Sequence, residues 1–191
     1  MSYIESARKQ FAYYKHLGEK TIDQLQDEHL NWQYNEECNS IVTIVRHLYG
    51  NMLSRWTDFL TTDGEKEWRN RDAEFANQPC DRTALLQLWN DGWNCLFAAL
   101  GQLTDDDLNT IIYIRNEGHT VMEAINRQLA HYPYHVGQMV FIGKMAAGSQ
   151  WQSLSIPRGR SGSYNAEKFA SEKTRRHFTD ELLNKPSDTN Q

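Results

Sequence analysis

The sequence predicts an all-α protein, built as one helical bundle followed by a polar tail. Apolar residues recur near the 3.6-residue helical period in four long segments, and only four Pro and eleven Gly interrupt the 191 residues. Hydrophobic residues make up 39% of the chain and aromatic residues 12%, which is enough for a packed core. We expect the bundle domain at residues 1–165 and a partly helical tail at 166–191.

The first two helices are expected in the N-terminal third of the chain. The first covers about Ser2–Gln26. The second begins after Asn39 or Ser40, which are both good N-caps, and runs to about Leu60. The apolar stripe of this second helix consists of Ile41, Ile44, Val45, Leu48, Met52, Trp56 and Phe59.

The third helix is expected over Arg82–Leu100, capped by Asp81 and closed by Gly101. A long charged connection at residues 63–75 precedes it. A connection of this length permits the crossover that a parallel pair of neighbouring helices requires, and it also permits a simple hairpin.

The fourth helix is expected over residues 120–147 and ends at Gly148. Before it, residues 110–120 combine β-branched residues with an Asn-Glu-Gly stretch, which predicts a short extended segment and a turn. After it, about fifteen residues lack clear periodicity and predict a loop. We expect a polar helix at 166–183 and frayed chain at 185–191.

Charge and hydropathy narrow the classes of function. The net charge of −5 provides no broad basic face for nucleic acid or anionic lipid. No apolar run approaches the roughly 18–20 residues of a membrane span, and the N-terminal segment lacks the apolar core of a signal peptide. Cys38, Cys80 and Cys95 form no CxxC pair and are expected to be free thiols. We therefore expect a cytoplasmic location.

Two histidines stand four residues apart in the fourth segment, at His131 and His135. On a helix this spacing places both side chains on one face, where two imidazoles can bind one divalent ion. An HxxxH pair alone is weak evidence, because a chain with seven histidines can carry such a pair on its surface. His47, beside the apolar stripe of the second helix, could supply a third ligand from a facing helix.

Pro133 lies between the paired histidines and removes one backbone hydrogen bond from a helix. Its position is roughly 200° around the helix from His131, so we predict a bent but continuous helix that keeps both imidazoles on one face. The alternative is a turn at Tyr132, which would separate the pair. We expect Tyr132 and Tyr134 to pack between helices.

Three stretches carry a family resemblance: HLYGNMLSRWTDFLTTDGEKEWRNRDAEF, HYPYHVGQ and WQSLSIPRG. Over about residues 1–165 the chain resembles an uncharacterised branch of the DinB-like (DinB/YfiT) superfamily of metal-binding four-helix-bundle proteins. The resemblance implies an up-down-down-up bundle, a homodimer, and zinc or nickel bound by His47, His131 and His135.

Three neutral imidazoles leave at least one open position on such an ion, where a water or a thiol can be deprotonated near neutral pH. The resemblance favours S-transfer of a low-molecular-weight thiol to a small-molecule substrate, and hydrolysis is the other enzymatic option. A non-catalytic metal-binding or stress-response protein is the alternative function. A third interpretation has the histidines satisfied by hydrogen bonds without any metal.

Candidate substrate-binding residues come from positions near the ligands. Asn51 lies one turn beyond His47, and its alternative role is a helix–helix hydrogen bond. Gln138 lies three residues after His135, with ordinary hydrogen bonding as the alternative. Arg55 and Arg158 could bind an anionic substrate, or they could be solvent-facing or bridging charges. The sequence identifies no catalytic acid or base.

Overall fold

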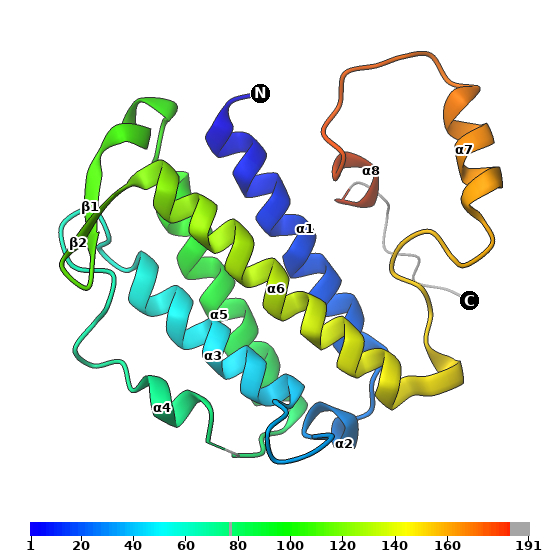
Figure 1. Ribbon diagram of the computed structural model, residues 1–191, viewed down its shortest axis with the longest axis horizontal. Coiled ribbons are helices and arrows are strands. Elements are labelled where there is room, and N and C mark those ends of the chain that lie inside the picture. Colours follow the sequence, from blue (N-terminus) through cyan, green and yellow to red (C-terminus); the bar gives the residue numbers. More distant parts are fainter. Residues whose placement is uncertain (77, 184–191) are drawn as a thin grey trace.

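In the computed structural model, which describes residues 1–76 and 78–183, the chain is mostly helical with one two-stranded sheet (Figure 1). The all-α fold class is confirmed at this level. The long helices are α1 (Tyr3–Asp23), α3 (Ile41–Trp56), α5 (Arg82–Gly101) and α6 (Val121–Ala147). The shorter elements are α2 (Asp27–Leu30), α4 (Arg71–Glu74), α7 (Ser161–Phe169), α8 (Asp180–Leu183), the 3-10 helices η1 (Asp105–Asn109) and η2 (Gly148–Gln150), and the strands β1 (Ile111–Ile114) and β2 (Glu117–Thr120).

N-cap side chains fix where the long helices begin. Ser2, Ser40, Asp81 and Thr120 each accept a hydrogen bond from the backbone N–H three residues further on. Such a cap typically contributes about 1 kcal/mol, because it satisfies a backbone donor that has no partner inside the helix. These are the starts that the sequence predicts, within one residue.

The ends of three helices differ from the prediction. Helix α1 ends at Asp23 instead of about Gln26, with Gln24 at the C-cap position. Helix α3 ends at Trp56 instead of about Leu60, because Thr57 is extended and Asp58 has a φ of 46°. Helix α5 includes Gly101 as its last residue, and Gln102 takes the cap position in a right-handed conformation. All three corrections concern the final turn, which local sequence specifies least.

The long helices share one core. Phe11 of α1, Trp93 of α5 and Tyr132 of α6 form a triangle with ring centroids 5.8–6.4 Å apart. Helix α3 packs chiefly on α5, and α1 packs chiefly on α6. In Figure 1, α3 and α5 run in one direction while α1 and α6 run in the other. The chain between α3 and α5 crosses the length of the molecule and carries α4 over one side (Figure 1).

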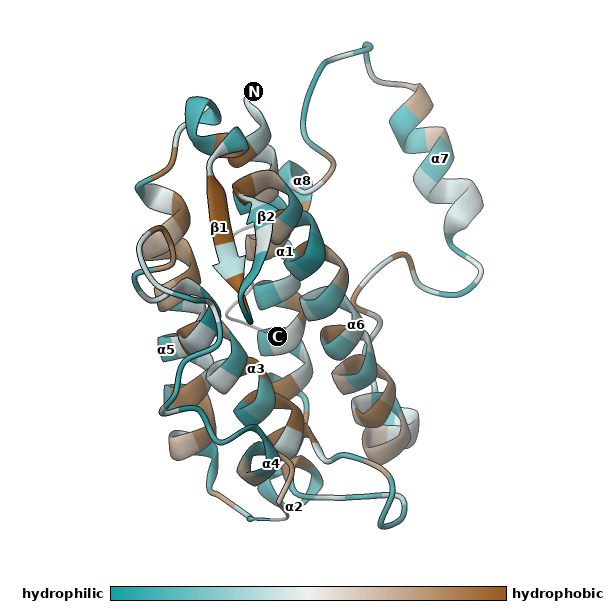
Figure 2. Ribbon diagram, turned by 60° about the vertical axis from the view of Figure 1, so that its left-hand side comes forward, coloured by the Kyte–Doolittle hydropathy of each residue, from teal (hydrophilic) through white to brown (hydrophobic). Residues whose placement is uncertain are grey.

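The extended segment expected at 110–120 is an antiparallel hairpin in which Ile111 pairs with Thr120. Its turn residues Arg115 and Asn116 both have positive φ, at 57° and 62°. The carboxylate of Asp63 accepts a hydrogen bond from each of their backbone N–H groups at 2.8 Å. Asp63 thereby ties the hairpin to the connection between α3 and α5. Figure 2 shows β1 as largely hydrophobic and the connection around α4 as mainly hydrophilic.

The prediction of a polar helix at 166–183 is wrong in its position. Helix α7 begins earlier, at Ser161, and ends at Phe169, so it also spans the predicted domain boundary at 165/166. The following chain packs on α1 instead of continuing as helix, because Asp180 forms an ion pair with Lys9 at 2.7 Å and His177 hydrogen-bonds Ser6 at 3.2 Å. The fraying expected at 185–191 lies outside the described residues.

Among the described residues, no helix combines the length and the apolar character that crossing a membrane would require.

Candidate metal centre

Three histidines from two helices converge at one point. His47 comes from α3, and His131 and His135 come from α6. The Nε2 atom of His131 lies 3.2 Å from Nε2 of His47 and 3.1 Å from Nε2 of His135. The three potential ligand atoms all lie within 4.8 Å of one another. His47 is 4% exposed and His135 is 8% exposed, so the cluster is largely shielded from water.

Pro133 does not interrupt α6. The helix runs without a break from Val121 to Ala147, with Pro133 inside it. The prediction of a continuous helix is therefore confirmed, and the alternative of a turn at Tyr132 is wrong. Because the helix is continuous, His131 and His135 keep the one-turn spacing that directs both imidazoles toward α3.

The Nδ1 atom of each imidazole, on the ring edge away from the cluster, has an oxygen acceptor. The Nδ1–H group of His47 donates to the Glu74 carboxylate at 2.9 Å. The Nδ1–H group of His131 donates to the side-chain oxygen of Gln128 at 3.1 Å, and that of His135 to the side-chain oxygen of Gln138 at 2.8 Å. A neutral imidazole that donates through Nδ1 has a lone pair on Nε2. All three Nε2 lone pairs therefore face a common point.

This donor set fits a divalent metal ion. The Nε2 lone pair of His131 lies about 3 Å from those of His47 and His135, and lone pairs this close repel one another unless a cation lies between them. Two ligands placed 2.0–2.1 Å from a tetrahedral ion lie about 3.3 Å apart, close to the two short separations in this cluster. An outer carboxylate or amide on the second nitrogen is the usual environment of a metal-binding histidine, because it fixes both tautomer and ring orientation.

Burial keeps two of the imidazoles neutral. Desolvation, followed by the neighbouring histidines and arginines, lowers the pKa of His131 to about 3. Desolvation and the proximity of His47 lower the pKa of His135 to about 4. Both side chains are therefore unprotonated at neutral pH, which is the form that binds a metal.

Glu74 is one of the site residues that the sequence did not reveal. It is the last residue of α4. Arg69, just before this helix, donates to its two carboxylate oxygens through Nε at 2.7 Å and Nη2 at 2.9 Å. Burial alone would raise the pKa of Glu74, but hydrogen bonds from His47 and Arg69 outweigh burial and lower it. The carboxylate is therefore ionised and can orient His47.

A glycine in α3 offered one signal for this contact. Gly50 lies within a helix, where glycine costs about 0.5–1 kcal/mol relative to alanine. A Cβ at that position would lie 2.8 Å from Cδ of Glu74. Glycine therefore makes the room that the buried carboxylate needs. Gln128 carried a simpler signal, because it precedes His131 by three residues on the same face of α6.

Of the four candidate substrate residues, Asn51 and Arg55 lie in the cavity beside the histidines. Asn51 accepts a hydrogen bond from the Tyr132 hydroxyl at 3.1 Å, which is the helix–helix bond considered as its alternative role. Arg55 is only 4% exposed and so does not face solvent, but its Nη2 atom lies 3.9 Å from the Glu65 carboxylate, which is the bridging charge considered as its alternative role. The cavity has a volume of about 340 Å³ and is lined by His47, Asn51, Arg55, Arg69, Arg71, Phe75, Arg115, Arg127, Gln128, His131 and His135.

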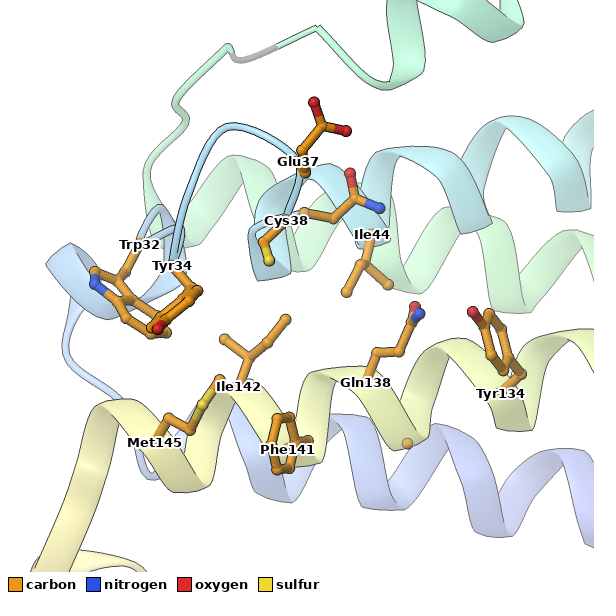
Figure 3. A pocket seen from close by; sticks show the side chains of 12 residues that line it. Trp32, Tyr34, Glu37, Cys38, Ile44, Tyr134, Gln138, Phe141, Ile142 and Met145 are labelled. Atoms are coloured by element: carbon orange, nitrogen blue, oxygen red, sulfur yellow. The ribbon is translucent and has the colours of Figure 1, made fainter.

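The other two candidates lie elsewhere. Gln138 accepts a hydrogen bond from His135 and also lines a second cavity of about 500 Å³ (Figure 3). Arg158 is exposed in the loop before α7 and is not among the residues that line the histidine cavity, so the structure does not bring it to the site. Tyr132 is buried as predicted, but Tyr134 is 63% exposed and lines the second cavity instead of packing between helices.

The fold and this cluster define the class of the protein as a helical domain with a candidate three-histidine metal centre. Comparison with family models matches residues 1–160 to DUF1572, a family described as proteins of unknown function. The chain belongs to the DUF1572 family. No curated protein and no solved structure matches it.

Proposed function

We propose that this protein binds a divalent metal ion through His47, His131 and His135 and uses it as an enzyme acting on a small molecule. One observation carries the proposal: each Nδ1–H has an acceptor behind it, so that all three Nε2 lone pairs face one point. The resemblance to the DinB-like superfamily supports thiol S-transfer as the reaction, and hydrolysis is the second option.

Nitrogen ligands suit zinc and nickel, and either ion, when bound, would lower the pKa of a water or thiol toward neutrality. The protein's own residues supply the positioning. Glu74, Gln128 and Gln138 orient the imidazoles, and the Phe75 ring, 4.8 Å from that of His47, covers one side. The remaining side opens into the 340 Å³ cavity, which leaves room for a substrate.

The same resemblance supports an up-down-down-up four-helix bundle and a homodimer. The common direction of α3 and α5 and the long connection between them are what such a bundle requires (Figure 1). Light scattering on the purified protein would measure the mass, and a monomeric mass at micromolar concentration would contradict the dimer.

A non-catalytic metal-binding protein is the second candidate, and one observation favours it. Among the described residues that line the cavity there is no carboxylate, hydroxyl or thiol that could act as general acid or base. A metal-binding or stress-response role requires no such group.

Metal analysis of protein purified without a histidine tag tests the proposal. We expect about one zinc or nickel ion per chain, and protein without stoichiometric metal would contradict it. Metal-loaded protein should then be supplied with low-molecular-weight bacterial thiols and a halogenated aromatic electrophile. Metal-dependent turnover supports the enzyme, and bound metal without turnover across the panel favours the binding protein.

A further inference from the structure

The cavity beside the three histidines is cationic, although the whole chain carries a net charge of −5. Arg55, Arg69, Arg71, Arg115 and Arg127 line it, and no carboxylate does so among the described residues. Cationic side chains repel one another when they gather around a space of about 340 Å³. Their arrangement therefore calls for negative charge nearby.

Two carboxylates behind the lining neutralise part of this charge. Glu65 lies 3.1 Å from Arg115, 3.5 Å from Arg69 and 3.9 Å from Arg55, and Glu74 binds Arg69. A third carboxylate, Asp63, accepts hydrogen bonds from the backbone N–H groups of the hairpin turn.

The two remaining arginines have no such neutralisation. Among the described residues, no carboxylate lies within ion-pair distance of Arg71 or Arg127, and Arg71 lies 5.0 Å over the Phe75 ring. Positive charge is therefore left at the cavity wall.

Arg55 is the buried member of this group. Its side chain is 4% exposed, and its Nε and Nη1 atoms have no hydrogen-bond partner. A buried guanidinium with unused donors is costly, since each donor has lost water without gaining an acceptor. An oxoanion in the cavity would satisfy these donors, because carboxylate and phosphate match the fork of N–H groups on guanidinium.

The helices place this positive charge at one end of the cavity. On α3, Arg55 follows His47 by eight residues, and on α6, Arg127 precedes His131 by four. Because α3 and α6 run in opposite directions, both arginines lie on the same side of the histidines (Figure 1). A rise of 1.5 Å per residue places their backbones about 12 Å and 6 Å from those of the ligands.

Arg115 reaches the cavity from a strained position. Its φ of 57° is left-handed, which glycine and asparagine adopt more readily than arginine does. Asp63 holds this conformation through the backbone N–H groups of Arg115 and Asn116. Arginine at such a turn is unfavourable for the hairpin by itself, and a role for its charge in the cavity gives a reason for it.

We propose that the cavity binds a small molecule with a carboxylate or phosphate group, held by Arg55 and Arg127, whose other end faces the three histidines. The cavity volume limits this ligand to a few atoms between the acidic group and the reactive group. The inference names the substrate class of the proposed metal centre and so rests on the proposed function.

The first experiment tests the anion site without metal. Full-length protein stripped of metal with a chelator is titrated calorimetrically at low salt with succinate and, separately, with inorganic phosphate. We expect saturable binding of at least one probe, weakened about 10-fold or more by Arg127→Gln. Arg158→Gln removes the same charge from an exposed loop and should leave binding unchanged. The tighter probe identifies carboxylate or phosphate as the natural group.

Two results would overturn the inference. One is the absence of saturable binding for both probes. The other is equal weakening by Arg127→Gln and Arg158→Gln, which would show only a general effect of net charge. Because Arg55→Gln could destabilise the fold, Arg55→Lys is the better variant at that position. It keeps the charge but loses the bidentate geometry, and it should also weaken binding.

The second experiment connects the anion site to the metal. Cobalt-loaded protein is titrated with 3-mercaptopropionate and with 1-propanethiol, and binding is followed in the visible spectrum. We expect the carboxylated thiol to bind about 10-fold more tightly, with this preference lost in Arg127→Gln and kept in Arg158→Gln. Equal binding of the two thiols would overturn the inference.

The two proposals fail in distinguishable ways. If the metal-free protein binds succinate or phosphate but takes up no metal, the anion site stands and the proposed function fails. If the protein binds metal but neither succinate nor phosphate, the metal centre stands and the anion site fails.

Discussion

Two cavities lie along helix α6, and they differ in the side chains that line them. Histidines and arginines line the polar cavity of about 340 Å³, and each imidazole there has an oxygen acceptor at its Nδ1. The apolar cavity of about 500 Å³ is lined mainly by apolar side chains from α6 and the segment before α3 (Figure 3). Gln138 connects the two, since it binds His135 and lines the apolar cavity.

The difference shows that the polar side chains with fixed orientations are concentrated around the three histidines. Metal-binding residues require fixed orientations, and the protein supplies these through buried hydrogen bonds. The apolar cavity contains exposed rings, with Tyr134 and Phe141 each 63% exposed, and its lining includes no histidine or arginine among the described residues. Three substitutions and one change of pH test this division.

His131→Ala should have the largest effect. His131 is the central member of the cluster, because its Nε2 lies within 3.2 Å of both other Nε2 atoms. Its loss removes a ligand, so metal affinity should fall by more than the roughly 10- to 100-fold that loss of an outer partner causes. Metal content and competition with a chelator would measure this. His29→Ala, in α2, is the matched control, and a similar loss in that variant would contradict a specific site.

Glu74→Gln should have the next largest effect on the polar cavity. The amide oxygen can still accept the Nδ1–H of His47, but it has lost the charge that strengthens this bond, and it leaves Arg69 without its ionic partner. We expect metal affinity to fall about 10- to 100-fold. Glu67→Gln changes the same charge at an exposed position and serves as the control. Unchanged metal affinity in Glu74→Gln would remove Glu74 from the site.

Acidification should destabilise the metal-free protein between about pH 6.5 and pH 4. Histidine in the unfolded chain has a pKa of about 6.5, whereas the folded pKa values of His131 and His135 are about 3 and about 4. In this interval the unfolded chain binds more protons, so the free energy of unfolding falls as pH falls. Thermal unfolding of wild type at pH 7 and pH 5 measures the decrease.

The same measurement on His131→Ala identifies the source of the pH dependence. The variant lacks one buried neutral imidazole, so its melting temperature should fall less between pH 7 and pH 5. An equal fall in both proteins would place the dependence elsewhere in the molecule.

Phe141→Ser should have the smallest effect and tests the apolar cavity. Phe141 is 63% exposed, so its replacement should change the free energy of unfolding by no more than about 0.5 kcal/mol. Metal affinity should not change, because Phe141 does not line the cavity beside the three histidines. Denaturant titration and metal competition provide the two measurements. Reduced metal affinity would show that the two cavities are coupled through Gln138.

The local sequence was sufficient to predict where the long helices begin and which three histidines form the cluster. The caps at Ser2, Ser40, Asp81 and Thr120 act on backbone groups within three residues, so their effect is visible in the sequence. The one-turn spacing of the paired histidines is equally local, and Pro133 could be judged from helix geometry alone.

Only the tertiary structure decided what surrounds the histidines. Glu74 and Arg69 lie in a charged connection that is typical of a solvated loop, yet their side chains are only 9% and 2% exposed once this chain crosses α3. Arg158 looked equally suitable for binding an anion, but its loop leads away from the cavity. Burial and hydrogen bonding between distant segments depend on how whole helices pack. The sequence of one segment therefore specifies a ligand spacing but not the residues that hold those ligands in place.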